Sequence, residues 1–259
     1  MPPSRKSPRK ARRTGPQVLL SLLAVGGATA ALLLWQPWEK PAASPAPVAT
    51  AAPSSNAPAG TTTPATNTPP QDAPGFINAG NEALGHGDFV GALEFYDQAA
   101  KLAPEDEETH FNRGCALARL GRTNEAMQAY GEALRLFPEY GEAHNNLANL
   151  LADQGRLNDA LNHLTAALKA SPENSTWLNN YGRCLAKLGN LREAALQFGE
   201  ALRLNPEYLE ARYNLATARL SLGQYDLAIT EFEEILRRAP GFVPAQRALQ
   251  LARERKAGR

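Results

Sequence analysis

From residue 73 onward, apolar side chains recur every three or four positions, in pairs of short blocks separated by a glycine. This spacing places the apolar side chains of each block on one side of an α-helix. In residues 175–208 the glycine is Gly189, which suits the left-handed backbone that ends a helix. Pro206 follows the second block and stops a helix there, because proline lacks an N–H and clashes in a helix interior. The pattern therefore predicts a helical hairpin.

The same hairpin pattern recurs every 34 residues, with no insertion, in residues 73–106, 107–140, 141–174, 175–208 and 209–242. Glycine recurs at Gly87, Gly121, Gly155, Gly189 and Gly223, and alanine at Ala92, Ala126, Ala160, Ala194 and Ala228. An aromatic residue or leucine recurs at Tyr96, Tyr130, Leu164, Phe198 and Phe232, and proline at Pro104, Pro138, Pro172, Pro206 and Pro240. Small residues recur at Gly80, Gly114, Ala148, Gly182 and Ala216. Small residues on the inner face of a helix let two axes approach closely, so we predict five stacked hairpins.

This set of small, aromatic and proline positions resembles the tetratricopeptide repeat family, whose repeat has the same length. The resemblance covers residues 73–242. It implies an all-α fold, a right-handed superhelical solenoid of five helix-turn-helix repeats, in which the first helix of each repeat lines a concave face.

Two departures from the family pattern are not expected to disturb the fold. The fourth repeat position, aromatic in the family, is Phe76, His110, His144, Leu178 and Arg212 in the five copies. Ile235 replaces a small residue in the fifth copy. Residues 243–259 then begin with one further amphipathic stretch, which we expect to form a helix that caps the last apolar face.

Residues 18–35 contain no charged side chain. A helix of this length spans roughly 27 Å, close to the ~30 Å hydrocarbon core of a bilayer. Six Lys or Arg side chains precede it, and the positive-inside rule then keeps residues 1–17 in the cytoplasm. We predict a transmembrane signal anchor at residues 18–35, with the repeats exported to the periplasmic side of a bacterial inner membrane. A cleaved signal peptide is the alternative, and it exports the repeats as well.

Residues 36–72 consist mostly of Pro, Ala, Thr and Ser, with almost no large apolar side chain. Such a segment cannot bury enough surface to offset the entropy that is lost on ordering. We therefore predict a disordered, proline-extended linker between the anchor and the repeats.

The formal net charge of the chain is +1, but its two ends differ in sign. Residues 73–259 hold 20 basic and 24 acidic side chains, so the repeats are mildly acidic. A surface that binds nucleic acid needs a basic stripe to replace counterions. We therefore expect no nucleic-acid partner.

Residues that usually carry catalysis or bind metals are few and scattered. Cys115 and Cys184 lie two repeats apart, too far for a disulfide, and no Cys/His spacing suggests zinc. His110 and His144 share a repeat position in neighbouring hairpins, and we expect both to serve packing. No HExxH motif and no phosphate-binding glycine loop occur. We predict a protein that is not an enzyme and that has no catalytic residues, no cofactor and no metal.

The sixth repeat position is asparagine in every copy, at Asn78, Asn112, Asn146, Asn180 and Asn214. An asparagine amide has a donor and an acceptor, so it can bind the N–H and the C=O of a peptide unit whatever the side chain. First helices should lie roughly 10 Å apart, and an extended peptide advances ~3.3–3.6 Å per residue, so each asparagine would meet about every third residue. This row resembles the asparagine ladder of the repeat domains of O-GlcNAc transferases and some cargo adaptors.

The positions beside the asparagines vary and would supply sequence preference. We predict a peptide-binding groove lined by the five asparagines together with Phe111, Asn145, Asn149, Asn179, Arg183 and Tyr213. Repeat duplication alone is the other explanation of the asparagine row, and the sequence leaves both open. No carboxylate clamp is expected, because the fifth repeat position has no lysine and the sixth has no arginine.

These features predict a membrane-tethered scaffold that binds an extended segment or a helix of a partner protein in the concave groove. By analogy with the fold, the expected context is assembly of an envelope complex. Two alternatives stay open. One is a self-associating, homo-oligomeric platform, and the other is an accessory subunit that delivers substrates to a separate enzyme.

Overall fold

The computed structural model of the protein describes residues 70–258. The predicted anchor at residues 18–35, the predicted tail at residues 1–17 and the predicted linker as far as residue 69 lie outside the described residues. Within residues 70–258, none of the helices combines the length and the apolar character that a membrane span requires.

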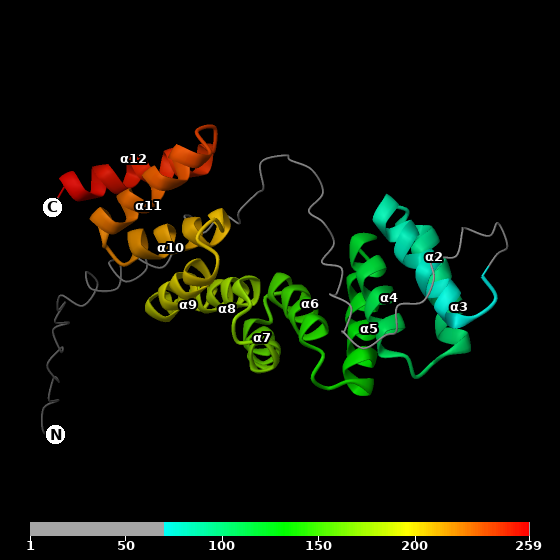
Figure 1. Ribbon diagram of the computed structural model, residues 1–259. Helices are drawn as coiled ribbons and strands as arrows, with labels where there is room; N and C mark the ends of the chain where they lie inside the picture. The colour runs from blue at the N-terminus through cyan, green and yellow to red at the C-terminus, as the bar shows by residue number, and fades with distance from the viewer. Residues whose placement is uncertain (1–69, 259) are drawn as a thin grey trace, which may run out of the picture. The chain divides into compact units, whose positions relative to one another are not determined.

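Residues 70–258 form eleven α-helices and no strand (Figure 1). The helices are α2 (Ala73–His86), α3 (Phe89–Leu102), α4 (Glu107–Arg119), α5 (Thr123–Leu136), α6 (Gly141–Asp153), α7 (Leu157–Ala170), α8 (Ser175–Lys187), α9 (Leu191–Leu204), α10 (Leu209–Ser221), α11 (Tyr225–Arg238) and α12 (Val243–Ala257). Each even-numbered helix from α2 to α10 pairs with the next helix, and each second helix packs on the first helix of the following pair. The predicted all-α array of five hairpins and one terminal helix is confirmed.

A glycine ends the first helix of every hairpin, because the backbone is left-handed there. The five glycines have φ between 72° and 86°: Gly87, Gly121, Gly155, Gly189 and Gly223. At the first of them, Gly87 N–H donates to the carbonyl of Leu84, and Asp88 N–H donates to the carbonyl of Ala83. These bonds satisfy carbonyls that a helix end leaves unpaired, and only glycine adopts this backbone without strain.

Inside the hairpins, a small residue of the first helix lies beneath a large side chain of the second. The pairs, with the distance from an added β-carbon to the ring, are Gly80–Tyr96 (2.5 Å), Gly114–Tyr130 (2.6 Å) and Gly182–Phe198 (2.7 Å). The third and fifth hairpins have Ala148 and Ala216 at this position, and both are fully buried. The small residue therefore allows the two helix axes to come close enough for the large side chain to fill the space between them.

A polar side chain at the fourth repeat position closes the turn between successive hairpins. It hydrogen-bonds the carbonyl of the repeat's proline, which lies just beyond the preceding helix and has no helical partner. The contacts are His110 Nε2 with Pro104 O (2.8 Å), His144 Nε2 with Pro138 O (2.9 Å), Arg212 Nη2 with Pro206 O (2.9 Å) and Gln246 Nε2 with Pro240 O (2.8 Å). In these four places the departure from the aromatic residue of the family pattern supplies a hydrogen-bond donor, whereas Leu178 of the fourth hairpin supplies none.

Both ends of the array are polar. α12 buries Ala245, Ala248, Leu249 and Ala252 on one side and exposes Gln246, Arg247, Gln250 and Arg253. At the other end, Glu82 is exposed at the position where the later first helices bury Ala116, Cys184 and Ala218. Neither end presents an apolar face on which a further hairpin could stack, and α12 is the capping helix that the sequence predicted.

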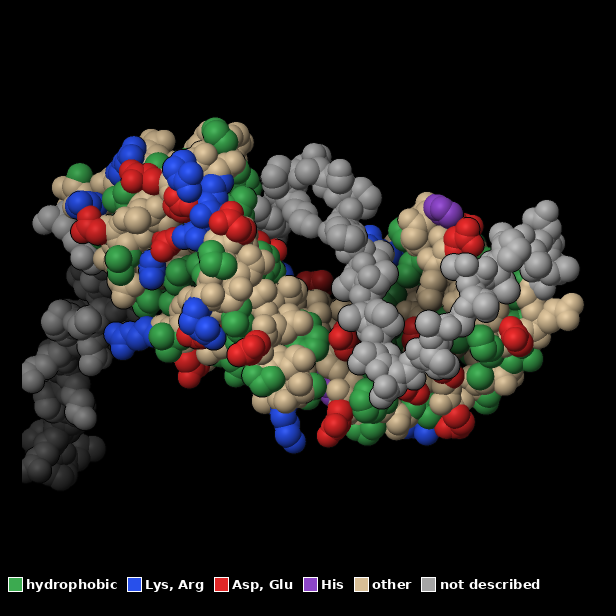
Figure 2. Space-filling view, in the orientation of Figure 1, with side chains coloured by type: hydrophobic (Ala, Val, Ile, Leu, Met, Phe, Trp, Pro, Cys, Tyr) green, Lys and Arg blue, Asp and Glu red, His purple; other side chains and the backbone are tan. Residues whose placement is uncertain are grey.

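The basic side chains near the C-terminal end do not form a continuous basic surface. Figure 2 shows them interspersed with acidic side chains over α11 and α12. Arg237 lies 2.7 Å from Glu234, and Arg253 lies 2.7 Å from Glu233. Their charges are therefore balanced locally.

Alanine at Gly182 should lower the thermal stability of the protein, whereas alanine at Gly199 of the same hairpin should raise it. A β-carbon at Gly182 forces the buried ring of Phe198 to shift, which costs roughly 1–3 kcal/mol. Nothing lies within 4 Å of a β-carbon at Gly199, so alanine there only removes the helix penalty of glycine, ~0.5–1 kcal/mol. Circular-dichroism melts of the full chain in mild detergent measure both variants. Shifts of the same sign would contradict the packing described.

Candidate peptide-binding face

Five first helices carry the predicted site, and each contributes the fifth, sixth and ninth positions of its repeat. We call the surface made by these positions the asparagine face. It comprises Ile77, Asn78 and Asn81 of α2, Phe111, Asn112 and Cys115 of α4, Asn145, Asn146 and Asn149 of α6, Asn179, Asn180 and Arg183 of α8, and Tyr213, Asn214 and Thr217 of α10. The sixth-position asparagines become more buried along the chain, from the exposed Asn78 to Asn214, which is 4% exposed.

In the C-terminal half, asparagine amides bond to one another between first helices. Asn180 Nδ2 donates to Asn145 Oδ1 at 2.9 Å, and Asn214 Nδ2 donates to Asn179 Oδ1 at 2.9 Å. The fifth position is asparagine in the third and fourth hairpins, so it offers an acceptor to the sixth position of the next hairpin. All four side chains are buried, at 8% exposure or less. A ligand could use these paired Nδ2 and Oδ1 atoms only by displacing the bonds between them.

Two further predicted side chains are also engaged in this half. Arg183 Nη1 donates to Asn180 Oδ1 at 3.4 Å and lies 3.7 Å from Glu210 Oε1. Glu210 also accepts from Asn179 Nδ2 at 3.1 Å. Tyr213 is 5% exposed and belongs to the core around the last hairpin. These contacts hold the first helices of the C-terminal hairpins together.

The N-terminal half is different, because its fifth position is apolar. Ile77 and Phe111 offer no acceptor to the sixth position of the next hairpin. Among the described residues, no side-chain hydrogen bond is made by Asn78, which is exposed, or by Asn112, which is half-buried. The structure therefore leaves the donors and acceptors of these two amides available to a ligand.

The middle of the asparagine face is intermediate. Asn146 Nδ2 lies 3.8 Å from Cys115 Sγ, and Asn146 Oδ1 accepts from Asn145 Nδ2 at 3.2 Å. Asn149 is half-buried. The third hairpin is thus where the exposed part of the asparagine face meets the part that is used internally.

Two tyrosines of the second helices reach the asparagine face from the core. Tyr96 O–H donates to Asn81 Oδ1 at 2.7 Å, and Tyr130 O–H points to Cys115 Sγ at 3.6 Å. Burial raises the pKa of the Cys115 thiol, so it stays protonated near neutral pH and is a poor nucleophile. These contacts position Asn81 and Cys115 without using the sixth-position asparagines.

Aromatic side chains border the asparagine face beside α4. The ring centroid of Tyr140 lies 4.8 Å from that of Phe111 and 5.8 Å from that of Phe137. These separations are typical of aromatic contacts. Phe137 is 44% exposed, although it is a large apolar side chain. Phe111, which precedes Asn112, therefore belongs to a chain of aromatic contacts that ends at the partly exposed Phe137.

A histidine pair lies between α6 and α7 of the third hairpin. The Nδ1 atoms of His144 and His163 are 2.8 Å apart. His144 Nε2 donates to the Pro138 carbonyl, so its Nδ1 is the acceptor and His163 Nδ1–H is the donor. The sequence analysis grouped His144 with His110 through their shared repeat position and did not predict the contact between His144 and His163. The available signal was that one repeat contains two histidines, one on each predicted helix.

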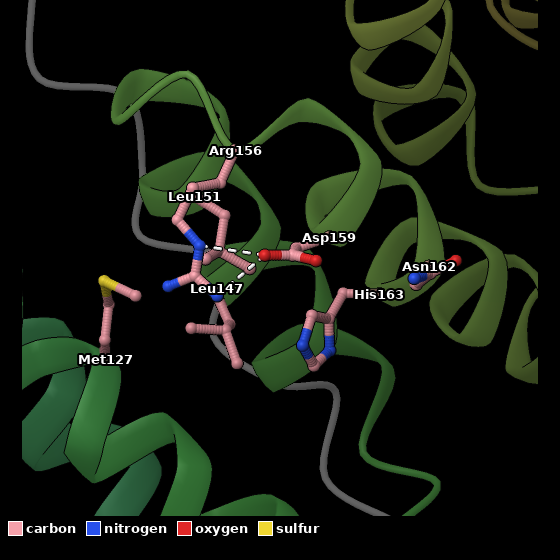
Figure 3. A pocket seen from close by; sticks show the side chains of 7 residues that line it. All are labelled: Met127, Leu147, Leu151, Arg156, Asp159, Asn162 and His163. Carbon is pink, nitrogen blue, oxygen red and sulfur yellow. Dashed lines mark hydrogen bonds and ion pairs between the residues drawn. The ribbon is translucent and has the colours of Figure 1, made fainter.

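His163 also lines an open cavity of about 380 Å³ (Figure 3). The lining residues are Met127, Leu147, Leu151, Arg156, Asp159, Asn162 and His163. Figure 3 shows Arg156 and Asp159 directed toward each other, and their charged groups are 2.7 Å apart. Among the residues that the structure describes, no three His, Cys, Asp or Glu side chains are placed to hold a metal ion. We assign this cavity no ligand.

Alanine at Asn180 should destabilise the protein more than alanine at Asn78, although both occupy the sixth repeat position. Both substitutions gain the same helix propensity, so the difference reports the environment. Loss of Asn180 leaves the buried Asn145 Oδ1 without its donor, which costs roughly 1–3 kcal/mol. The exposed Asn78 should change stability by less than about 0.5 kcal/mol. Equal melting temperatures for the two variants would refute the internal role of the amides.

Acid should destabilise the third hairpin through His163. Burial lowers the pKa of His163 below its ordinary value of about 6.5, with smaller contributions from His144 and Arg156 opposed by Asp159. Below that pH the unfolded chain binds a proton that the folded chain resists, so stability is present above about pH 6.5 and is lost as pH falls further. The melting temperature of His163→Gln should therefore fall less between pH 7 and pH 5 than that of the parent. Parallel pH profiles would contradict this assignment.

Comparison with known families gives tetratricopeptide repeat models that match residues 107–140, 145–199 and 185–241. The search of curated proteins gave no match.

Several solved structures are similar in fold. MamA (residues 41 to the end) from Desulfovibrio magneticus RS-1 has a TM-score of 0.61 at 20% identity, covering 68% of this chain and 99% of that chain. YrrB, described as a repeat protein of this type with an unusual peptide-binding site, has a TM-score of 0.60 at 24% identity, covering 69% of this chain and 92% of that chain. A tetratricopeptide repeat protein from Parabacteroides merdae has a TM-score of 0.62 at 23% identity, covering 71% and 73%. At these identities the likeness shows the fold.

Proposed function

Since the chain belongs to the tetratricopeptide repeat family, we propose that it is a protein-binding scaffold. Its ligand is an extended segment of a partner protein. This segment lies along the N-terminal part of the asparagine face, formed by α2, α4 and α6.

The contrast between the two halves of the asparagine face carries this proposal. The side-chain Nδ2 groups of Asn180 and Asn214 donate hydrogen bonds to asparagines of the preceding hairpins. The amides of Asn78 and Asn112 have no such partner among residues 70–258. If the asparagine row served packing alone, Asn112 would need an acceptor in the preceding hairpin, and the apolar Ile77 provides none. Asn78 lies on α2, the first helix of the described array, and has no preceding hairpin there.

The spacing of the free amides suits a peptide backbone. First helices are expected roughly 10 Å apart, and an extended chain advances ~3.3–3.6 Å per residue, so Asn78 and Asn112 would bind peptide units about three residues apart. Each amide can accept from a backbone N–H and donate to a backbone C=O. The exposed ring of Phe137 adds apolar surface for a side chain of the same segment. A solved structure of similar fold, YrrB, is described as having an unusual peptide-binding site, which agrees with this use of the fold.

Membrane tethering is part of the proposal and rests on the sequence. The uncharged residues 18–35 and the six basic side chains before them support an anchor whose cytoplasmic end is the N-terminus. The repeats would then act on the periplasmic side, in assembly of an envelope complex. Self-association by end-to-end stacking has no support in the array, because both of its ends are polar.

A selected-peptide experiment tests the proposed site. Peptides are first selected from a random library for binding to the full chain in mild detergent. Fluorescence anisotropy then measures their affinity for the parent, for Asn78→Ala/Asn112→Ala and for a control, Asn124→Ala/Asn162→Ala. The two asparagines of the control are exposed and lie on second helices. Each peptide hydrogen bond contributes about 0.5–1.5 kcal/mol, so the first variant should lose about tenfold or more in affinity. The control should bind like the parent. Equal affinity in all three proteins would overturn the proposal.

A further inference from the structure

We propose that the partner segment presents a lysine or arginine side chain to Glu108 and Glu142, at the N-terminal ends of α4 and α6. This inference rests on the proposed function and names the chemistry of its ligand.

Helical geometry places both carboxylates beside the asparagine face. Glu108 precedes Phe111 by three residues and Asn112 by four, so it lies on the same side of α4. Glu142 stands in the same relation to Asn145 and Asn146 on α6. Both glutamates are exposed. A peptide that reaches the asparagines therefore passes within reach of these carboxylates.

Tyr140 shows that the two carboxylates act on one region. Burial raises its pKa most, and the negative charges of Glu108 and Glu142 raise it further. The ring of Tyr140 lies against Phe111, beside Asn112. A cation placed here would gain from both carboxylates and from the faces of the neighbouring aromatic rings.

In the fifth hairpin, the glutamate at the same repeat position as Glu108 and Glu142 has a cationic side chain of the chain itself beside it. Glu210 is the equivalent of Glu108 and Glu142 in the fifth hairpin, and Arg183 of the preceding hairpin lies 3.7 Å from it. The residues equivalent to Arg183 in the first and second hairpins are Asn81 and Cys115, which carry no positive charge.

No ion pair to Glu108 or Glu142 is recorded within residues 70–258, whereas the nearby Glu105 has Arg135 at 3.6 Å. The two cationic side chains of α4 are engaged elsewhere. Arg113 pairs with Asp97 at 2.6 Å, and Arg119, at the C-terminal end of the helix, lies 5.6 Å from the ring centroid of Phe89. The N-terminal hairpins thus keep the carboxylates of the C-terminal ion pair and lack its cation, which a basic partner segment supplies.

A charge-scanning experiment on the full chain in mild detergent tests this inference. The probe is a positional-scanning peptide library in which one position at a time is fixed as Lys, Gln or Glu. The parent should prefer Lys to Gln at one position by about fivefold, the effect of two exposed charge pairs, and salt should reduce the preference. Glu108→Gln/Glu142→Gln should abolish the preference without changing the affinity for the Gln peptide. The control Glu94→Gln/Glu193→Gln, which removes the same net charge from exposed sites on second helices, should keep it.

The outcomes separate this inference from the function on which it rests. If peptides bind through Asn78 and Asn112 but show no preference for Lys, the inference fails and the scaffold stands. If no peptide in the library binds, the proposed function itself fails. The double glutamine variant could also melt at a lower temperature and keep the preference for Lys. The carboxylates would then serve to stabilise the helix dipoles, and the inference would be overturned. In a further variant the six basic side chains of residues 5–13 are replaced by glutamine. A gain in its peptide affinity would show that the chain's own tail supplies the cation, and this too would overturn the inference.

Discussion

The close approach of the two helices within each hairpin is the contact on which the rest of the array depends. A glycine or alanine of the first helix lies under an aromatic or leucine side chain of the second, as Gly182 does under Phe198. This fixes the separation and rotation of the helix pair, because a larger residue would push the buried ring away. Once the pair is set, the second helix offers the same surface to each following hairpin. Every first helix then presents the same repeat positions to one side, which brings asparagines from distant parts of the chain into one row.

The same backbone serves two purposes along this row. Where the fifth position is asparagine, as at Asn145 and Asn179, it accepts from the sixth position of the next hairpin and ties the first helices together. Where it is Ile77, the sixth-position Asn112 of the next hairpin finds no acceptor there, and its amide makes no side-chain hydrogen bond within residues 70–258. The proposed ligand would use this amide. Burial follows this division, because an amide without an internal partner is costly to bury and is tolerated only where water or a ligand can reach it.

Side chains that depart from the family pattern have local physical roles. The histidines, arginine and glutamine at the fourth position donate to the carbonyls of the repeat prolines, which lie beyond the preceding helices. Arg183 bonds Asn180 and lies beside Glu210, so a charged residue of the predicted groove belongs to an internal network. Comparing the same position in all repeats shows what the copies have in common, whereas these roles differ from one copy to the next. They could therefore not be derived from that comparison.

The sequence by itself determined the all-α hairpin array, the position of its turns and the helix that covers its last apolar face. These follow from local rules, since helical periodicity, left-handed glycine and helix-stopping proline act within a few residues of one another. It also identified the asparagine row, because identical repeats place identical positions on one face. Only the tertiary structure decided which asparagine side chains form hydrogen bonds within the chain. That depends on side chains 35 residues apart, such as Asn180 and Asn145, meeting across neighbouring helices, and hydrogen bonding there is a property of the packed array.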